Sequence, residues 1–478
     1  MSSQKLLVFY DRSMLFSFCA LIYFLPISIA LVEIFSGFAL FFYLLKRGTL
    51  FWKNIQNNTQ EWTSLSFGKK CLKFLQIFKP ITNDLTKPIT VFLAVCFISI
   101  FPSQYFHVGL IGFLGKLLQS AFVYFTFLEC INTKKRLKIF LTAFFLSFTL
   151  ISINGLFQSI TGEGFIHGHL EEPDTRIRSS LRSTNDFGAY LVMAIPIFSF
   201  MLISIKSFFK KTPLILLVCI ALLCLGLTYS RGAWVAFILC FFWGGLKNKK
   251  ILWYFGIIFI IFTLLFIPKM IKNRTDNSPS FIINGFHESI ETASAVVKKT
   301  NTPNNEKLSA WKQKTLFFKT FTKRFFYYID YYIRVKGNRI PYWETAWKIF
   351  KTRPLLGIGF NNYSLVSINT GLPWGGYPHN CYLQLLAETG ILGLSAFLWL
   401  IISIFKNTKQ KLLALDDPFL KFLFIGTLTG LLGFFINIFV DTHFYSVQLS
   451  VLMWLLMGIS AAIPIIQTSS KKTILQKK

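Results

Sequence analysis

Charged residues are scarce in this sequence, and acidic residues are the scarcest of them. Asp and Glu together number 20 in 478 residues, and all charged residues make up 15% of the chain. A soluble domain typically has about a quarter of its residues charged, so the composition argues against a string of soluble domains. The sequence also has no Asp-x-Asp motif. We therefore expect no bound metal.

Paired cysteines are absent as well. The eight cysteines include no Cys-x-x-Cys pair, and six lie within or at the ends of apolar runs, where cysteine behaves as a small hydrophobic residue. We expect neither a disulfide framework nor a zinc site. The first apolar stretch has no small-residue cleavage site, so we predict that it spans the membrane and is not removed. The six cysteines are Cys19, Cys96, Cys130, Cys219, Cys224 and Cys240.

Long hydrophobic runs fill most of the chain. Hydrophobic residues make up 53% and aromatic residues 18%, and the mean hydropathy is +0.53. Many runs are long enough to cross roughly 30 Å of hydrocarbon, where the backbone must satisfy its hydrogen bonds internally. We predict an all-α polytopic integral membrane protein with about 12 transmembrane helices. The predicted spans are 14–30, 31–45, 88–104, 108–131, 136–159, 186–205, 212–228, 231–247, 250–268, 382–405, 418–440 and 444–466.

Basic residues in the short loops predict the orientation. With twelve spans, five basic segments and both termini fall on one side, which is the cytoplasm by the positive-inside rule. The net charge of +30 fits contact with anionic membrane lipids. Because the basic residues lie in short loops between apolar spans, we expect no nucleic acid partner. The basic segments are 46–87, 132–138, 206–211, 247–250 and 406–411.

The spans divide the chain into three parts. Nine N-terminal spans cover residues 1–268, a large basic outer loop covers 269–381, and three C-terminal spans with a basic cytoplasmic tail cover 382–478. The loop carries 17 Lys or Arg against 6 Asp or Glu, an excess of 11. Such a charge is costly in self-repulsion unless something anionic binds there. For its lysine-rich stretch 298–324, contact with lipid headgroups is an equally good explanation.

Two helices are predicted within this loop. Basic and aromatic residues alternate from Leu308 to Tyr332, which is typical of an amphipathic helix at the membrane surface. A short helix is expected over 341–352, with Pro341 in its first turn and Pro354 just past its end. The glycine-rich stretch that begins at Gly357 is a turn, since it lacks the strand and helix of a nucleotide-binding fingerprint.

Three polar clusters are predicted to face the outer compartment. Ser230-Arg231-Gly232 holds an arginine embedded in apolar sequence, which is usually kept for a partner or substrate, although at a span end it can also reach a headgroup. Arg339 precedes the short loop helix, and alone it would be a solvated loop arginine. His379 stands just before the tenth span, where histidine suits proton transfer. A single histidine there is more often a helix cap or a headgroup contact.

Together these clusters resemble the O-antigen ligase family. The spacing His379-Asn380, nine residues, Gly390, two residues, Gly393 is similar to the signature of that family. The element around Ser230-Arg231-Gly232 resembles the family's Ser-Arg-Gly element, and the stretch from Asn338 to Asn362 resembles the one that leads into its catalytic histidine. The similar core covers about 212–400.

The resemblance implies a membrane glycosyltransferase of lipopolysaccharide biosynthesis. Such an enzyme transfers a glycan from undecaprenyl pyrophosphate to lipid A–core, on the periplasmic face of the bacterial inner membrane, with inversion and without metal or cofactor. Arginine matches phosphate oxygens in a bidentate way, and a histidine can deprotonate the acceptor hydroxyl. The expected catalytic residues are His379, Arg231 and Arg339, and the expected substrate-binding residues are Arg182, Asn380 and Ser230.

Two kinds of alternative stay open. An O-antigen polymerase and a protein O-oligosaccharyltransferase use the same donor chemistry and differ in their acceptor. A small-anion transporter is a different class, because relatives in the broader superfamily have been labelled bicarbonate transporters. Transporters usually place ionisable residues near the bilayer midplane at broken helices. Here the middles of the spans are nearly free of charge, with Lys116 and Glu129 the main candidates, which favours an enzyme.

Overall fold

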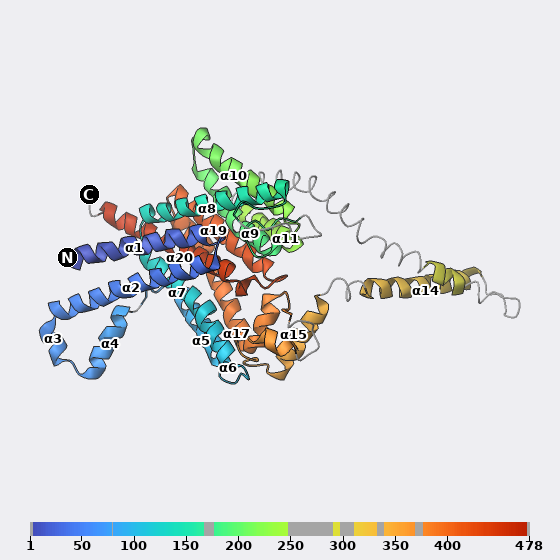
Figure 1. Cartoon of the computed structure of the whole chain (residues 1–478), viewed down its shortest axis with the longest axis horizontal. Coiled ribbons are helices and arrows are strands. Elements are labelled where there is room, and N and C mark those ends of the chain that lie inside the picture. The colour runs from blue at the N-terminus through green and yellow to red at the C-terminus, as the bar shows by residue number, and fades with distance from the viewer. Residues whose placement is uncertain are drawn as a thin grey trace. The chain divides into compact units, whose positions relative to one another are not determined.

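The structure is a computed structural model, and the residues that it describes are helical, with no β-strand among them (Figure 1). This confirms the predicted all-α class. The chain divides into two compact units, the first made of Met1–Phe255 with Lys348–Lys478 and the second of Gly256–Trp347. The described residues are 3–78, 80–166, 176–246, 290–296, 310–331, 339–368 and 376–475.

Within these residues, nine helices are long and apolar enough to cross a membrane, and α5 and α11 are shorter apolar helices. Together they coincide with eleven of the twelve predicted spans, while 250–268 lies outside the described residues. The helices of the first unit are α1 (Ser3–Phe24), α2 (Ile29–Asn57), α3 (Thr59–Ser64), α4 (Phe67–Phe78), α5 (Thr86–Ile100), α6 (Phe106–Gly112), the π-helix η1 (Phe113–Leu118), α7 (Gln119–Cys130), α8 (Lys134–Thr161), α9 (Thr184–Ser204), α10 (Phe208–Leu227), α11 (Arg231–Gly245), α16 (Tyr363–Ile368), α17 (Cys381–Phe405), α18 (Thr408–Ala414), α19 (Pro418–Asn437), the 3₁₀-helix η4 (His443–Tyr445) and α20 (Val447–Leu475).

The boundary between the first two spans was predicted wrongly. Spans 14–30 and 31–45 were expected, but α1 ends at Phe24 and α2 begins at Ile29. The break contains Pro26, which has no backbone N–H for a helical hydrogen bond. Ser28 then caps α2, because its hydroxyl accepts a hydrogen bond from the backbone N–H of Leu31 at 3.5 Å. Helix α2 also continues well past the predicted end, to Asn57.

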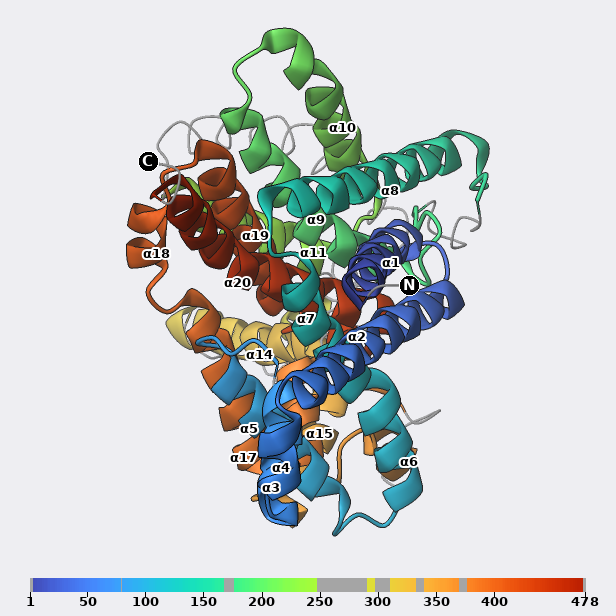
Figure 2. The same cartoon turned by 90° about the vertical axis from the view of Figure 1, so that its left-hand side faces the viewer.

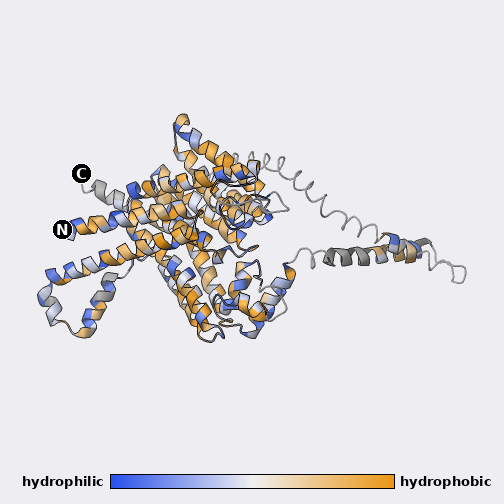
Figure 3. Ribbon diagram, viewed as in Figure 1, coloured by the Kyte–Doolittle hydropathy of each residue, from blue (hydrophilic) through white to orange (hydrophobic). Residues whose placement is uncertain are grey.

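Helices α9, α19 and α20 form the centre of the first unit (Figure 2). A Cβ atom on Gly430 of α19 would lie 2.4 Å from the carbonyl oxygen of Met193 in α9, and one on Gly426 would lie 2.9 Å from the Cα of Ile197. Small residues of this kind let membrane helices approach closely. Hydrophobic residues also predominate along the outer helices (Figure 3), and large apolar side chains such as those of Phe16 and Leu146 are exposed. The bundle therefore has an apolar outside, as a lipid environment requires.

Ion pairs join α1, α2, α7 and α8. Lys46 lies 2.9 Å from both Asp11 and Glu129, Arg47 lies 2.8 Å from Glu129, and Arg136 lies 3.0 Å from Asp11. Glu129 was expected to be one of two charges in the middle of a span. It lies instead in this cluster near the end of α7, where two cations compensate it. Glu129 therefore gives no support to a transport path.

The second unit contains α14 (Ala310–Tyr331) and the first residues of α15 (Ile340–Thr352). Both helices were predicted, over 308–332 and 341–352. Lys312, Lys314 and Lys319 are exposed on α14, and the rings of Phe317 and Phe321 stack at 6.3 Å. The predicted helix is confirmed, and its location at the membrane surface stays a prediction.

Candidate active site

His379 lies at the start of α17, in a strained backbone conformation. Its φ is +47°, which is uncommon for a residue other than glycine and is kept only where the surroundings hold it. Asn380 caps the helix, because its side-chain oxygen accepts a hydrogen bond from Leu383 N at 3.1 Å. Next to it, Cys381 N donates to the carbonyl of Ile438 at 2.9 Å. These contacts fix the turn and leave 45% of the His379 side chain exposed.

The imidazole of His379 faces a carboxylate from the loop after α19. His379 Nδ1 lies 3.3 Å from Asp441 Oδ1. Asp441 also accepts hydrogen bonds from Thr442 N and from Asn185 Nδ2, both at 2.9 Å. Burial alone would raise the pKa of Asp441, but its hydrogen bond with His379 and the charge of His443 lower that pKa well below its usual range. The ionised carboxylate favours a proton on Nδ1, which makes Nε2 the proton acceptor of the ring.

A second histidine–aspartate pair adjoins the first. His443 Nδ1 lies 3.0 Å from Asp186 Oδ1, and His443 Nε2 lies 3.8 Å from Asp441 Oδ2. His443 is 4% exposed, so it is a buried neighbour of Asp441 and not an open site. Asp186 lies in the first turn of α9, whose N-cap is Ser183. Asp441 is thus held between two imidazole rings.

The sequence prediction missed Asp441, His443 and Asp186. The first two stand in the short outer loop between the last two predicted spans, which consists of residues 441–443 alone. The other short outer loops between predicted spans, 105–107 and 229–230, hold no Asp, Glu, Lys or Arg, and an aspartate in so short a loop was the available signal. Asp186 was assigned to the beginning of a span, where an acidic residue in the first helical turn is an ordinary helix-stabilising feature.

The Ser-Arg-Gly element packs against the same loop. Arg231 begins α11, with Ser230 as its N-cap, and the Arg231 side chain is exposed. A Cβ atom on Gly232 would lie 2.4 Å from Val440 Cγ2, and one on Gly188 of α9 would lie 3.3 Å from the Cβ of Ser230. The glycines therefore let the start of α11 approach both α9 and the residue next to Asp441. The start of α11 therefore lies against the loop that supplies Asp441, and the roles of Ser230 and Arg231 in the site stay predictions.

The segment before α9 supplies further arginines. Arg176 donates from Nε to the carbonyl of Thr228 at 2.9 Å and from its terminal nitrogen to Asn185 Oδ1 at 3.3 Å. Asn185 in turn donates to Asp441, so Arg176 connects the Ser-Arg-Gly turn with the His379 partner. Arg182 lies two residues before α9 and is exposed, and its carbonyl accepts a hydrogen bond from Arg178 at 3.0 Å. Arg182 therefore borders the site without being part of its hydrogen-bond network.

Arg339 lies in the second unit, at the start of α15. Its carbonyl oxygen accepts a hydrogen bond from Trp343 N at 3.0 Å, which closes the first turn of the helix. Its membership of the site stays a prediction that rests on the family resemblance.

The predicted turn around Gly357 fits into a break in α17. At Gly390 the helix has φ +65° and ψ −167°, a region that only glycine adopts readily. Across the break, Ile358 N donates to the carbonyl of Ala387 at 3.1 Å and Ile391 N donates to the carbonyl of Pro354 at 2.9 Å. A Cβ atom on Gly390 would lie 2.2 Å from the carbonyl oxygen of Leu355. The first glycine of the signature is therefore explained by the structure, because only a residue without a side chain leaves room for this turn.

Glu388 fastens the turn to α17. It is fully buried, and four groups donate to its carboxylate: Tyr363 N and Gln384 Nε2 to one oxygen, both at 3.1 Å, and Asn361 N at 2.8 Å and Tyr445 OH at 2.7 Å to the other. A carboxylate has about four acceptor positions, so this one is saturated. The expectation that Lys116 and Glu129 are the main charges within spans left out Glu388, which stands inside the predicted span 382–405.

Lys116 belongs to the same region. Its ammonium group donates to Asn361 Oδ1 at 3.0 Å, from the π-helix η1. The lysine therefore supports the inserted turn from a second side. Among the described residues no group of three or more His, Cys, Asp or Glu is arranged to hold a metal ion, and metal-independent chemistry stays a prediction.

Comparison with known protein families matches residues 215–398 to the family described as O-antigen ligase. The match contains Ser230, Arg231 and His379, whereas Asp186 and Asp441 come from helices and loops outside it. No curated protein matches the chain. The resemblance predicted from the two motifs is confirmed, because residues 215–398 match the O-antigen ligase family model.

Proposed function

We propose that this protein transfers a glycan from undecaprenyl pyrophosphate to lipid A–core, on the periplasmic face of the bacterial inner membrane. The observation that carries the proposal is the pairing of His379 with Asp441 beside the Ser-Arg-Gly turn. His379 is a proton acceptor in a fixed orientation, and Arg231 is an exposed cation at the start of a helix. Both lie in segments predicted to face away from the cytoplasm.

The lipid-linked donor carries a diphosphate, which needs cations at the headgroup level. Arg231 offers a guanidinium, whose fork matches phosphate oxygens in a bidentate way. It stands at the first position of α11, where the helix dipole also favours an anion. Arg182 and Arg339 are the proposed further contacts. Their charges would stabilise the pyrophosphate as it leaves.

The acceptor hydroxyl is the nucleophile in the proposed step. Its oxygen attacks the anomeric carbon, the bond from that carbon to the pyrophosphate oxygen breaks, and undecaprenyl pyrophosphate leaves with the electron pair. His379 Nε2 takes the hydroxyl proton, and the ionised Asp441 stabilises the imidazolium that forms. Attack from the face opposite the leaving group inverts the anomeric centre. Asn380 acts indirectly, since its side-chain oxygen caps α17 next to His379.

Two readings with the same chemistry differ only in the acceptor, namely an O-antigen polymerase and a protein O-oligosaccharyltransferase. Transport of a small anion is less well supported. The broken helix α17 is a feature that transporters share, but the carboxylate of Glu388 at this break already accepts four hydrogen bonds from the protein. It is therefore engaged in holding the inserted turn.

Deletion of the gene separates these readings. For a ligase, lipopolysaccharide on a gel should lose all long-chain species while lipid-linked glycan accumulates. Retention of a single repeat on the core would indicate a polymerase instead. Unchanged lipopolysaccharide would contradict the proposed acceptor and point to a protein acceptor or to transport.

A further inference from the structure

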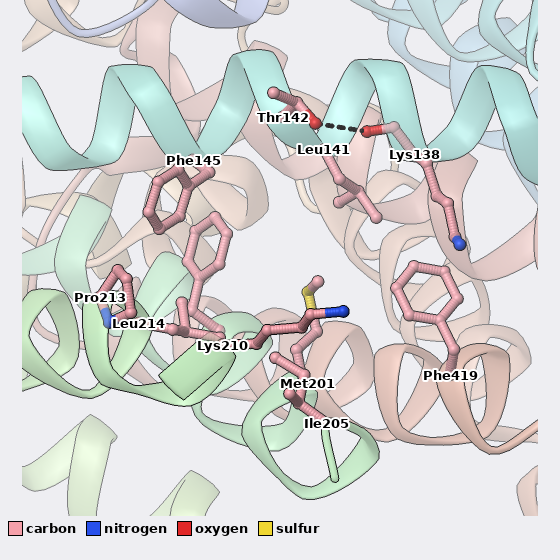
Figure 4. A pocket seen from close by; sticks show the side chains of 11 residues that line it. Lys138, Leu141, Thr142, Phe145, Met201, Ile205, Lys210, Pro213, Leu214 and Phe419 are labelled. Carbon is pink, nitrogen blue, oxygen red and sulfur yellow. Dashed lines mark hydrogen bonds between the residues drawn. The ribbon is translucent and has the colours of Figure 1, made fainter. Parts of the chain in front are cut away.

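A cavity lies between the ends of four helices on the side of the first unit opposite His379 in the predicted topology. Its volume is about 370 Å³, and residues of α8, α9, α10 and α19 line it. Figure 4 shows the apolar side chains of Phe145, Met201, Leu214 and Phe419 around this space. The cavity is therefore mostly apolar, and no residue of the proposed active site lines it.

Two lysines interrupt this apolar lining. The side chains of Lys138 from α8 and Lys210 from α10 both face the cavity (Figure 4), and both are exposed. Lys138 Nζ lies 5.4 Å from the centre of the Phe419 ring, which is within the range of a cation–π contact. No carboxylate among the described residues pairs with either lysine. The neighbouring Lys134, by contrast, is paired with Asp417.

The sequence places these lysines at one membrane boundary. Lys138 belongs to the basic segment 132–138 and Lys210 to the basic segment 206–211, both on the predicted cytoplasmic side. Phe145 lies seven residues further along α8 than Lys138, which is about 10 Å at the rise of an α-helix. The cavity therefore runs from the headgroup level into the apolar half of the inner leaflet.

We propose that this cavity binds an anionic phospholipid of the cytoplasmic leaflet. Its phosphate would lie between the Lys138 and Lys210 ammonium groups, and an acyl chain would lie against Phe145, Met201 and Leu214. Charge selects the lipid class, because two lysines that pair with no described carboxylate attract a net negative headgroup and not a zwitterionic one. The apolar lining selects a lipid over a soluble phosphate. This inference does not depend on the proposed glycosyl transfer.

Native mass spectrometry of the full-length protein in detergent tests this site. Dioleoyl phosphatidylglycerol and dioleoyl phosphatidylcholine are offered at equal concentration, so that the headgroup charge alone differs. Wild-type protein should retain phosphatidylglycerol preferentially. Each lysine near an anionic headgroup is worth about a fivefold change in affinity, so the double variant Lys138→Gln/Lys210→Gln should lose about 25-fold.

Two further variants distinguish this cavity from general surface charge. Lys135→Gln/Lys206→Gln removes the same charge from the same two segments at positions that do not line the cavity, and it should keep the preference. Met201→Trp fills the apolar part and should lower phosphatidylglycerol retention although both lysines remain. The proposal is overturned by equal retention of the two lipids in the wild type, by an equal loss in the control pair, or by full retention in Met201→Trp. Displacement of the lipid by soluble glycerol phosphate would overturn it as well.

Discussion

Asp441 determines how His379 can act. The carboxylate bonds to the imidazole Nδ1, and Asn185 and Thr442 donate to the carboxylate in turn. The carboxylate therefore favours one ring orientation, with a proton on Nδ1, before any substrate binds. A proton acceptor that is already aligned needs no reorganisation during the reaction. The residue before Asp441 is Val440, which lies against Gly232, so the same loop also contacts the start of α11.

Replacement of Asp441 by asparagine tests this role. Asp441→Asn keeps the size of the side chain but removes the negative charge, and a hydrogen bond to a charged group contributes about 1.5–3 kcal/mol. We expect glycan transfer in membranes to fall about 10- to 100-fold with normal protein levels. Asp416→Asn, at the exposed other end of α19, is the control and should retain full activity. Full transfer by Asp441→Asn would remove the aspartate from the mechanism.

The depressed pKa of Asp441 also predicts a stability effect. The pKa of an aspartate in the unfolded chain is about 3.9, and the folded value is lower because of His379 and His443, in spite of burial. Asp441 therefore contributes stability above about pH 4, and this contribution is lost as the pH falls through the folded-state pKa. Between pH 6 and pH 3 the Tm of detergent-solubilised wild type should fall further than that of Asp441→Asn. Parallel curves for the two proteins would show that Asp441 makes no such contribution.

At the scale of single residues, the sequence pointed to His379, Ser230 and Arg231, and their roles in the site stay predictions. The motifs name these positions directly. Asp441 and Asp186 were missed because their significance depends on contacts between distant parts of the chain. Asp441 is 62 residues from His379, and Asp186 is 257 residues from His443. Nothing in the local pattern of either aspartate distinguishes it from a loop residue or a helix cap.

Among the elements, α17 has the most unusual construction. An ordinary membrane helix would satisfy its own backbone hydrogen bonds, whereas α17 opens at Gly390 and bonds to the turn at Pro354–Ile358. Irregular backbone at membrane depth is tolerated where protein buries it. Here Glu388 and the surrounding helices do so. The inserted turn connects α15, which leads from the outer loop, with the helix that carries His379.

Gly390 should therefore tolerate no side chain. In Gly390→Ala the new methyl group would clash with the Leu355 carbonyl and the backbone would be strained, at a cost of about 3 kcal/mol or more. We expect a clearly lower Tm in detergent and a lower yield of folded protein. Gly37→Ala in α2 is the control, since nothing lies within 4 Å of its added Cβ, and it should leave the Tm unchanged or raise it. A Gly390→Ala protein as stable as the wild type would contradict the inserted turn.

The sequence predicted most elements but not this insertion. Hydropathy predicts α17 as one continuous span. The glycines of the signature can be read from the sequence, but their structural role cannot. The break follows from hydrogen bonds between Ile358 and Ala387 and between Ile391 and Pro354, which no periodicity encodes. The early break between α1 and α2 was misplaced for a similar reason, because the apolar run continues through Pro26.

At the scale of the whole molecule, the two predicted membrane faces have different proposed roles. The proposed active site gathers at the helix ends that the loop charges assign to the outside. The basic segments 132–138, 206–211 and 406–411 and the proposed lipid cavity lie at the opposite helix ends. Hydropathy and loop charge were sufficient to predict the all-α class and the helices in eleven of the twelve spans, because both signals are repeated along the whole chain.

The predicted topology can be tested with a native cysteine. Cys71 in α4 is exposed and belongs to the basic segment predicted to be cytoplasmic. A membrane-impermeant maleimide should label it only after spheroplasts are permeabilised. In a Cys71→Ser background, Thr161→Cys at the predicted outer end of α8 should be labelled in intact spheroplasts. The reverse pattern would place His379 on the cytoplasmic side and would contradict the proposed periplasmic reaction.

The most direct test of the central proposal is glycan transfer by the purified protein. The reaction holds an undecaprenyl-pyrophosphate-linked glycan and lipid A–core, and the release of undecaprenyl pyrophosphate is measured over time. Wild-type protein should release it with formation of the glycosylated acceptor, and His379→Ala, folded to the same Tm, should be slower by about 10²- to 10⁴-fold. Equal rates for the two proteins would contradict the role of His379, and with it this account of the site.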